Sequence, residues 1–295
     1  IVVGENNAGK SSVLEAAALL LRPFDPTQWV QMARCRDYDM LLVDGVWSLF
    51  PSGVSLQVDE GPKQTKLLRI DGCVAREPRE LSAEGIASLN WGAKETEQIV
   101  LEVEAEVKTG VNEYKQTLKF GTWPFAVTKQ EVMLYKSFTV TPAPHRSTGS
   151  MVELLSKAVD EGKKKFAVEL LNLFDPEVKG LDVSTSRSRS GVRVTHGTRG
   201  VVDLASFGDG MRRAAALALA LVRSQGGLLL VDELEASIHP RILPQVLKDL
   251  FKAAELADVQ ILATTHSLEA IDARVEALRE TRDRAVAYYM RREGE

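Results

Sequence analysis

The segment from Gly4 to Ser12, GENNAGKSS, holds residues whose types and spacing could bind phosphate. It fits the pattern G-x-x-x-x-G-K-[ST], with Gly9 as the second glycine, Lys10 as the cation and Ser11 as the hydroxyl. Glycine permits backbone angles that turn successive N–H groups towards phosphate oxygens. The lysine would reach the β and γ phosphates, and the serine hydroxyl would ligate Mg²⁺. The residues predicted to surround the phosphates are Gly4, Asn6, Asn7, Ala8, Gly9, Lys10, Ser11 and Ser12.

Two acids follow an apolar run later in the chain, Gly227–Val231, and could complete a site for Mg²⁺ and water. A continuous apolar run is typical of a central parallel strand, because helices cover both of its faces. Asp232 at its end would hold Mg²⁺ through water, and Glu233 would orient or deprotonate an attacking water. The alternative is an edge strand that runs into an acidic turn.

A second anion-binding turn comes shortly before that strand. Ser206, Gly208 and Gly210 form a small-residue turn that opens a helix, and the N-terminus of a helix attracts anions. One nucleotide does not need two such turns from one chain, whereas two chains packed head to tail do. The sequence therefore predicts a dimer in which each chain supplies its phosphate loop to one ATP and its Ser206 turn to the other.

The elements that must position these residues alternate between strand and helix. A buried strand leads into the phosphate loop and then into a helix over Lys10–Leu21, which Pro23 and Pro26 end. From Ser206 onward, the predicted helices and strands are Met211–Ser224, Gly227–Val231, Arg241–Leu256 and Gln260–Thr264. That order predicts an α/β fold with a mostly parallel sheet covered by helices.

The middle of the chain has a different pattern. Alternating apolar and polar residues predict antiparallel strands at Ser55–Val58, Lys66–Ile70, Ile99–Glu104, Tyr114–Phe120 and Val132–Val140. A helical pair follows, Met151–Asp160 and Lys163–Leu173, with Lys163–Lys165 typical of a solvated helix face, and then a hairpin over residues 192–204. We therefore expect a single ATPase domain, 1–295, in which 1–53 and 201–295 form the nucleotide-binding core and 54–200 is an inserted β-rich and helical region.

Composition limits the class of protein. The chain has 295 residues and a net charge of −4, so as a whole it has no electrostatic reason to seek nucleic acid. Its two cysteines, Cys35 and Cys73, have no metal-ligand spacing and fit a reducing, cytoplasmic setting. We find no apolar run of about 18 residues, the length that a membrane span needs. The chain starts within a strand and ends near another, so we expect further structure beyond both ends.

The motif SFGDG, which contains Ser206, resembles the signature sequence of ABC-type ATPases, a class of P-loop ATPases. Its place between the phosphate loop and the Asp232 strand is the order of that family. The resemblance implies binding of ATP and Mg²⁺, contact of the signature turn with the ATP of a second subunit, and Glu233 as a catalytic residue. It also implies that His266, at the end of the Gln260–Thr264 strand, contacts the γ-phosphate. The family's loop glutamine has three candidates here: Gln28, Gln31 and Gln57.

Three segments resemble the OLD-like (overcoming lysogenization defect) ATPases: GENNAGKSSVLEA, SFGDGMRRA and LLLVDELEASIHP. This resemblance implies a role in phage defence beside a partner or fused Toprim-type nuclease. Two alternatives stay open. One is an SMC- or RecF-like repair ATPase that binds DNA, for which a basic strip is available at Arg187, Arg189, Arg193 and Arg199. The other is the ATPase subunit of a transporter, whose membrane part another chain would supply.

Overall fold

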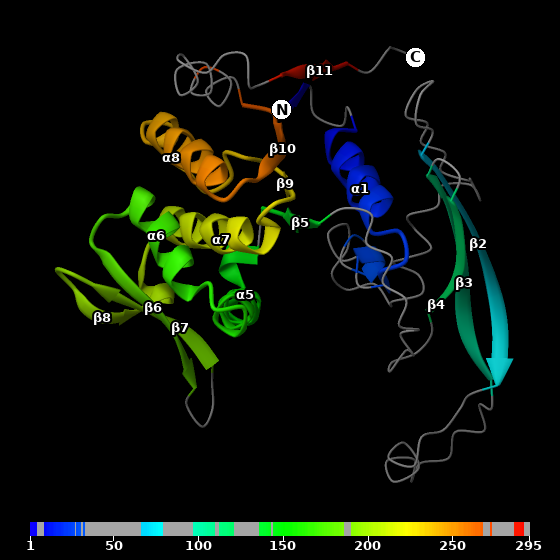
Figure 1. Cartoon of the computed structure of the whole chain (residues 1–295), viewed down its shortest axis with the longest axis horizontal. Coiled ribbons are helices and arrows are strands. Elements are labelled where there is room, and N and C mark those ends of the chain that lie inside the picture. The colour runs from blue at the N-terminus through cyan, green and yellow to red at the C-terminus, as the bar shows by residue number, and fades with distance from the viewer. Residues whose placement is uncertain are drawn as a thin grey trace, which may run out of the picture. The chain divides into compact units, whose positions relative to one another are not determined.

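In the structure, a computed structural model, the chain forms two compact units (Figure 1). The core unit comprises Ile1–Ala18 and Tyr135–Glu295, and the second unit comprises Leu19–Leu134. The residues that the structure describes are 1–4, 9–26, 28–30, 32, 66–78, 97–109, 112–120, 136–142, 144–185, 190–267, 272 and 286–291.

The core unit is built on a parallel sheet of five strands. Their order is β11 (Tyr288–Met290), β1 (Val2–Gly4), β10 (Gln260–Thr265), β9 (Leu228–Val231) and β5 (Ser137–Val140). Every neighbouring pair is parallel, so the carboxyl ends of the strands meet at one edge of the sheet. The α/β fold with a mostly parallel core sheet is thereby confirmed. The strand order places β10 between β1 and β9, which brings its last residues between the two motifs that follow those strands.

Helices cover both faces of this sheet, as the apolar run of β9 predicts. Leu229 and Val231 point into the main hydrophobic cluster of the unit. Leu230, between them, points to the opposite face and packs with Leu14 and Ala18 of α1 (Lys10–Leu21). Successive side chains of a strand alternate between faces, so a strand buried on both faces must be apolar at each position.

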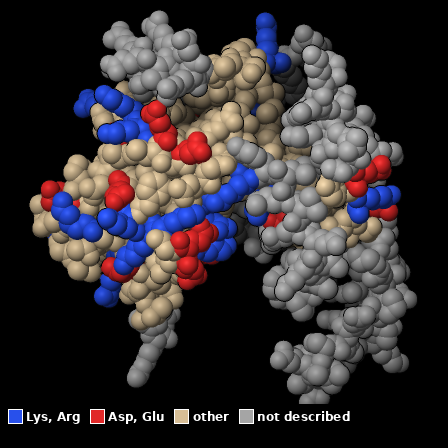
Figure 2. All heavy atoms as spheres, in the orientation of Figure 1, with Lys and Arg blue, Asp and Glu red and all other residues tan. Residues whose placement is uncertain are grey.

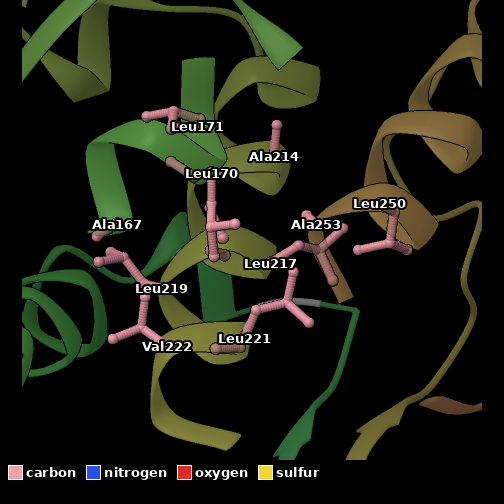
Figure 3. Packing of buried hydrophobic residues seen from close by; sticks show 14 of the residues in the cluster. Ala167, Leu170, Leu171, Ala214, Leu217, Leu219, Leu221, Val222, Leu250 and Ala253 are labelled. Atoms are coloured by element: carbon pink, nitrogen blue, oxygen red, sulfur yellow. The ribbon is translucent and has the colours of Figure 1, made fainter. Parts of the chain in front are cut away.

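Much of the main cluster lies where three helices meet, α6 (Lys164–Phe174), α7 (Asp209–Ser224) and α8 (Leu243–Leu256), and α5 (Thr148–Asp160) and several strands add residues to it. Figure 3 shows side chains of all three, among them Leu170, Leu217 and Leu250, gathered in this cluster. Burial of each leucine contributes roughly 1.5–3 kcal/mol before conformational entropy is counted. α7 is buried on almost every side, and its run of alanine and leucine lets neighbouring helices approach closely. Among the described helices, none is both long and apolar enough to cross a membrane.

Two smaller antiparallel sheets complete the structure. In the core unit, α5 (Thr148–Asp160) and α6 lie beside a sheet made of β6 (Val178–Thr185), β7 (Ser190–His196) and β8 (Gly200–Asp203). In the second unit, the sheet consists of β2 (Lys66–Pro78), β3 (Glu97–Thr109) and β4 (Asn112–Phe120). The predicted antiparallel strands Lys66–Ile70, Ile99–Glu104 and Tyr114–Phe120 are confirmed in this sheet, and the predicted helical pair is confirmed in the core unit. The predicted strand Ser55–Val58 lies outside the described residues.

The last of the predicted antiparallel strands, Val132–Val140, is assigned differently by the structure. Its described part, β5, is a parallel edge strand of the core sheet and pairs with β9, with Val140 opposite Val231. An alternating pattern reports that one face is buried but not which sheet buries it, so the sequence could not identify the partner. The compact units also follow bounds that differ from the predicted domains, because Tyr135 onward belongs with the core unit.

Candidate active site

The phosphate loop connects β1 to α1 at the carboxyl edge of the sheet. Gly4 ends β1, and a Cβ atom there would overlap the carbonyl oxygen of Met290 in β11. Gly9 has φ of +84°, a left-handed backbone that favours glycine, and α1 begins at the next residue. Nζ of Lys10 donates to the carbonyl oxygen of Gly4 at 2.9 Å, which holds the ammonium at the mouth of the loop. Three of the predicted phosphate-binding residues, Asn6, Asn7 and Ala8, lie outside the described residues.

Asp232 is the centre of a hydrogen-bonded cluster that joins three strand ends. Oγ of Ser11 donates to the carboxylate at 3.1 Å to Oδ1 and 3.2 Å to Oδ2. Oγ1 of Thr264 donates to Oδ1 at 2.6 Å. Ser11 and Asp232, predicted from separate motifs, are therefore brought together. Sequence reasoning missed Thr264, although a hydroxyl directly after the apolar run of β10 and two residues before His266 was a usable signal.

The chemistry of this cluster fits Mg²⁺. Hydroxyl and carboxylate oxygens are the ligands that Mg²⁺ prefers, and it usually takes one or two protein groups while phosphates and water supply the rest. Within the described part of the chain, His, Cys, Asp and Glu form no group of three or more that could hold a metal without a ligand's help. The donor set of Ser11 and Asp232 suits Mg²⁺ that phosphate and water also ligate.

Glu233 has an unusual backbone that its neighbours hold in place. Its φ is +48°, which costs on the order of 1–3 kcal/mol for a residue other than glycine. Its N–H donates to Oγ1 of Thr264 at 3.0 Å. Its carbonyl oxygen accepts from Nη2 of Arg213 at 3.3 Å. The residue is thus fixed on both sides of its Cα atom, which sets the direction in which the side chain leaves the backbone.

Arg213 is the residue of this site whose role was hardest to predict from the sequence. It belongs to α7 and is 0% exposed, although arginine is rarely buried. Besides Glu233, its guanidinium donates to the carbonyl oxygens of Thr141 at 2.5 Å and Asp232 at 3.2 Å. Burial lowers the pKa of Arg213 to about 10, and the charges of Asp232, Glu233 and Glu235 oppose that shift. The guanidinium therefore remains charged at neutral pH.

His266 lies at the end of β10, next to the acids that follow β9. Its backbone N–H donates to Oε1 of Glu235 at 3.2 Å, and its Nδ1 is 3.5 Å from the same oxygen. Glu235 is mostly buried, whereas the His266 side chain is 45% exposed. The ring is therefore oriented by an acid yet open to a ligand. The other histidine of this region, His239, accepts from the backbone N–H of Arg241 at 3.2 Å and caps the turn before α8.

The turn predicted to contact a second subunit's ATP opens α7. Ser206 and Gly208 are exposed, and Gly208 is the residue that caps the start of the helix. Oγ of Ser206 donates to the carbonyl oxygen of Asp203 at 2.6 Å. Phe207, between them, is buried with its ring 5.8 Å from that of His196. The buried ring of Phe207 holds the turn in place, and the small residues Ser206 and Gly208 are left exposed. Gly210 lies in the first turn of α7.

Several basic side chains on the core unit are paired with acids. The three residues predicted to form a solvated helix face have partners: Lys163 with Glu161 at 2.7 Å, Lys165 with Glu169 at 3.8 Å, and Lys164 with Asp182. Figure 2 shows Lys and Arg interspersed with Asp and Glu over the face of this unit turned to the viewer. Two residues of the suggested basic strip, Arg187 and Arg189, lie outside the described residues.

The candidates for a loop glutamine are not brought to the site by anything that the structure describes. Gln28 is 7% exposed, and its backbone N–H donates to the carbonyl oxygen of Asp25 at 3.0 Å. Gln31 and Gln57 lie outside the described residues. The assignment of this glutamine therefore stays a prediction.

His145 precedes α5 and is 1% exposed, with neither ring nitrogen hydrogen-bonded to any residue that the structure describes. Its pKa lies below the ordinary value of 6.5, first because of burial and then because of the charge of Arg213. The charged groups that act on it are Arg213, Asp209, Arg146 and Arg212. A proton on this ring is therefore disfavoured in the folded state.

We expect the stability of the protein to fall as the pH drops through about 6.5, because the unfolded chain then gains a proton at His145 that the folded chain resists. The melting temperature should decrease between about pH 7 and about pH 5.5. In His145→Gln, which cannot titrate, that decrease should be smaller. Thermal unfolding of both proteins at the two pH values measures it, and equal decreases would contradict the expectation.

Three comparisons relate the chain to known proteins. The family model described as "AAA domain, putative AbiEii toxin, Type IV TA system" matches residues 89–272. Uncharacterized protein MJECL11 of Methanocaldococcus jannaschii is 38% identical over 89 residues, which are 30% of this chain and 78% of that protein.

Solved SMC head domains are similar over most of their length at low identity. The SMC head bound to the C-winged helix domain of ScpA has a TM-score of 0.48 at 11% identity, over 92% of this chain and 83% of that one. The SMC head domain from Thermotoga maritima has a TM-score of 0.40 at 13% identity, over 92% and 81%.

Proposed function

The chain belongs to the AAA-domain family whose model spans residues 89–272, and from that premise we propose that it binds ATP with Mg²⁺ and hydrolyses the ATP between two copies of itself. The observation that carries the proposal is the contact of Ser11 with the Asp232 carboxylate, 3.1 Å from Oδ1. It joins the hydroxyl that follows the phosphate loop to the acid at the end of β9. A P-loop ATPase needs that pair to hold Mg²⁺ against the β and γ phosphates.

Each residue of the site has a chemical task in this proposal. Lys10 and the N-terminus of α1 bind the phosphate oxygens. Ser11 and Asp232 would hold Mg²⁺, whose positive charge would offset the charge that develops on the phosphates. Glu233 accepts a proton from the water that attacks the γ-phosphorus, while the bond to the bridging oxygen of ADP breaks. The exposed ring of His266 donates a hydrogen bond to the γ-phosphate.

The second half of the site is supplied by a second copy of the chain. The exposed residues Ser206 and Gly208 stand at the start of α7, a helix of 16 residues whose N-terminus attracts negative charge. In a head-to-tail dimer this turn, with Gly210, would cover the γ-phosphate bound by the partner. ATP then stabilises the closed dimer through its differential affinity for that state, and hydrolysis releases it.

For the biological role, we propose an OLD-like ATPase that controls a partner effector, such as a Toprim-type nuclease, in phage defence. The support is the set of three motifs that include Gly4, Ser206 and Glu233. The DNA-binding alternative is disfavoured by a net charge of −4, and the two lysines Lys163 and Lys165 are paired with acids. Binding to duplex DNA that weakens steeply with salt would support that alternative instead.

Replacing Lys10 with alanine should weaken ATP binding by about 10- to 100-fold, because a hydrogen bond to a charged group contributes roughly 1.5–3 kcal/mol. Titration of the protein with ATP and Mg²⁺ in a calorimeter measures the affinity. Lys157→Ala is the matched control, since Lys157 is exposed and pairs only with Glu153, at 2.6 Å, among the contacts described. If Lys10→Ala binds ATP as the control does, the proposed phosphate loop is wrong.

A further inference from the structure

We propose that Arg213 is a positioning residue that orients Glu233 for catalysis and ties that orientation to the signature helix α7. The inference rests on the proposed function, because it deepens the role of the same site. In this role Arg213 does not contact the reacting atoms. It acts through its hydrogen bond to the backbone of Glu233.

The groups that Arg213 contacts are all backbone carbonyl oxygens at strand ends. Its guanidinium reaches three backbone carbonyl oxygens, those of Thr141, Asp232 and Glu233, at 2.5, 3.2 and 3.3 Å. Two of these groups follow β9 and one follows β5, so a single side chain links the ends of adjacent parallel strands. Carbonyl oxygens left in the interior without donors would be unfavourable. A charged side chain with no exposed surface is an expensive way to satisfy them.

The backbone of Glu233 depends on the groups that hold it. At φ of +48° this residue adopts a conformation that only its surroundings can maintain. Its N–H is held by Thr264, at 3.0 Å, and its carbonyl oxygen by Arg213. The direction of the Glu233 carboxylate follows from the orientation of its backbone. Without the Arg213 contact, the backbone carbonyl group of Glu233 could change its orientation. The Glu233 carboxylate would then no longer point toward the attacking water.

The position of Arg213 along α7 places it close to the Ser206 turn. The helix begins at Asp209, directly after the exposed Ser206 turn, so Arg213 lies one turn from its start. A helix transmits a displacement of its first turn to the next one because consecutive turns are hydrogen-bonded. Contact of the Ser206 turn with the partner's nucleotide would therefore change the position or the mobility of Arg213. Because Arg213 contacts Glu233, this change would reach Glu233 of the same subunit. Hydrolysis of ATP in one subunit would then depend on contact of its Ser206 turn with the ATP of the other subunit.

The test uses Arg213→Lys and, as a second variant, Arg213→Met, with Arg223→Lys as the matched control on the same helix. Arg223 is surface-lying and pairs with Glu161 at 3.0 Å, away from the strand ends. We expect Arg213→Lys to lower turnover per ATP-binding site by at least about tenfold, while the ATP dissociation constant stays within about threefold of the native value. A purely structural role would lower the amount of folded protein and leave the turnover of each folded site unchanged.

A double-mutant cycle identifies the group through which Arg213 acts. Combined with Glu233→Gln, which already removes the proton acceptor, Arg213→Lys should lower turnover by less than about twofold more. Additive effects of the two changes would overturn the inference. So would native turnover in Arg213→Lys, and so would the failure of both Arg213 variants to fold, which would make Arg213 a structural residue only. If native protein fails to hydrolyse ATP, or Glu233→Gln turns over normally, the proposed function fails instead.

Discussion

Glu233→Gln is expected to trap an ATP-bound dimer of this chain and to lower turnover by about 100-fold or more, the range that general-base catalysis supplies. Glutamine matches glutamate in size but cannot accept the proton of the attacking water. The γ-phosphate that joins the two subunits would then persist. Light scattering during size-exclusion chromatography, with and without ATP and Mg²⁺, should report a shift from monomer to dimer mass that depends on nucleotide.

The structure gives a reason to expect that this variant folds normally. Thr264 and Arg213 hold Glu233 through its backbone N–H and carbonyl oxygen, so neither contact is lost when the carboxylate becomes an amide. Glu153→Gln is the matched control, because Glu153 is exposed and pairs with Lys157 on the surface of α5. If the Glu233→Gln protein binds ATP but has the same mass with and without ATP, the proposal that two subunits share the nucleotide is contradicted.

Those parts of the fold that are encoded locally could be predicted from the sequence. The phosphate loop needs glycine where φ is positive and where β11 passes closely, so its pattern is visible in nine consecutive letters from Gly4 to Ser12. The burial of β9 on both faces likewise leaves a run of apolar residues, because each face requires its own. Neighbouring residues determine such features, so they can be predicted without knowing which distant segments pack against them.

The features that depend on distant pairings could not be predicted in this way. β5 pairs with β9 across a long stretch of chain, and its alternating residues suit the edge of any half-buried sheet. The same is true of β10, whose place between β1 and β9 brings Thr264 to Asp232. A threonine at the end of a strand acquires its role only when the strand order is known.

Arg213 is the clearest case of such a hidden role. In the sequence it follows Arg212 at the start of a helix, where charged residues usually face water. Arg212 does remain partly exposed and pairs with Asp209 at 3.2 Å, while Arg213 turns inward to three carbonyl groups. Two adjacent arginines therefore have opposite environments, one partly exposed and one buried. Only the packing of α7 against the sheet determines which of them is buried.

Ser206→Arg should spare ATP binding by the single subunit and remove turnover. The Ser206 turn is exposed, and a side chain as large as arginine would prevent close approach of the partner's phosphate loop. The ATP dissociation constant of the monomer should stay within about threefold of native, with turnover reduced at least about 100-fold. Ser190→Arg, at an exposed position that starts β7, is the control for the added bulk and charge.

Mixing two inactive variants then tests whether the site is shared. Ser206→Arg has an intact phosphate loop, and Lys10→Ala has an intact signature turn, so a dimer of one with the other contains one complete site. If subunits mix randomly in equal amounts, half of the dimers are mixed and each has one of two sites, which predicts about a quarter of native turnover. A site built within one chain would gain nothing from mixing. Turnover that stays absent in the mixture, while each variant folds and Ser206→Arg binds ATP, would exclude the exchange of signature turns between subunits.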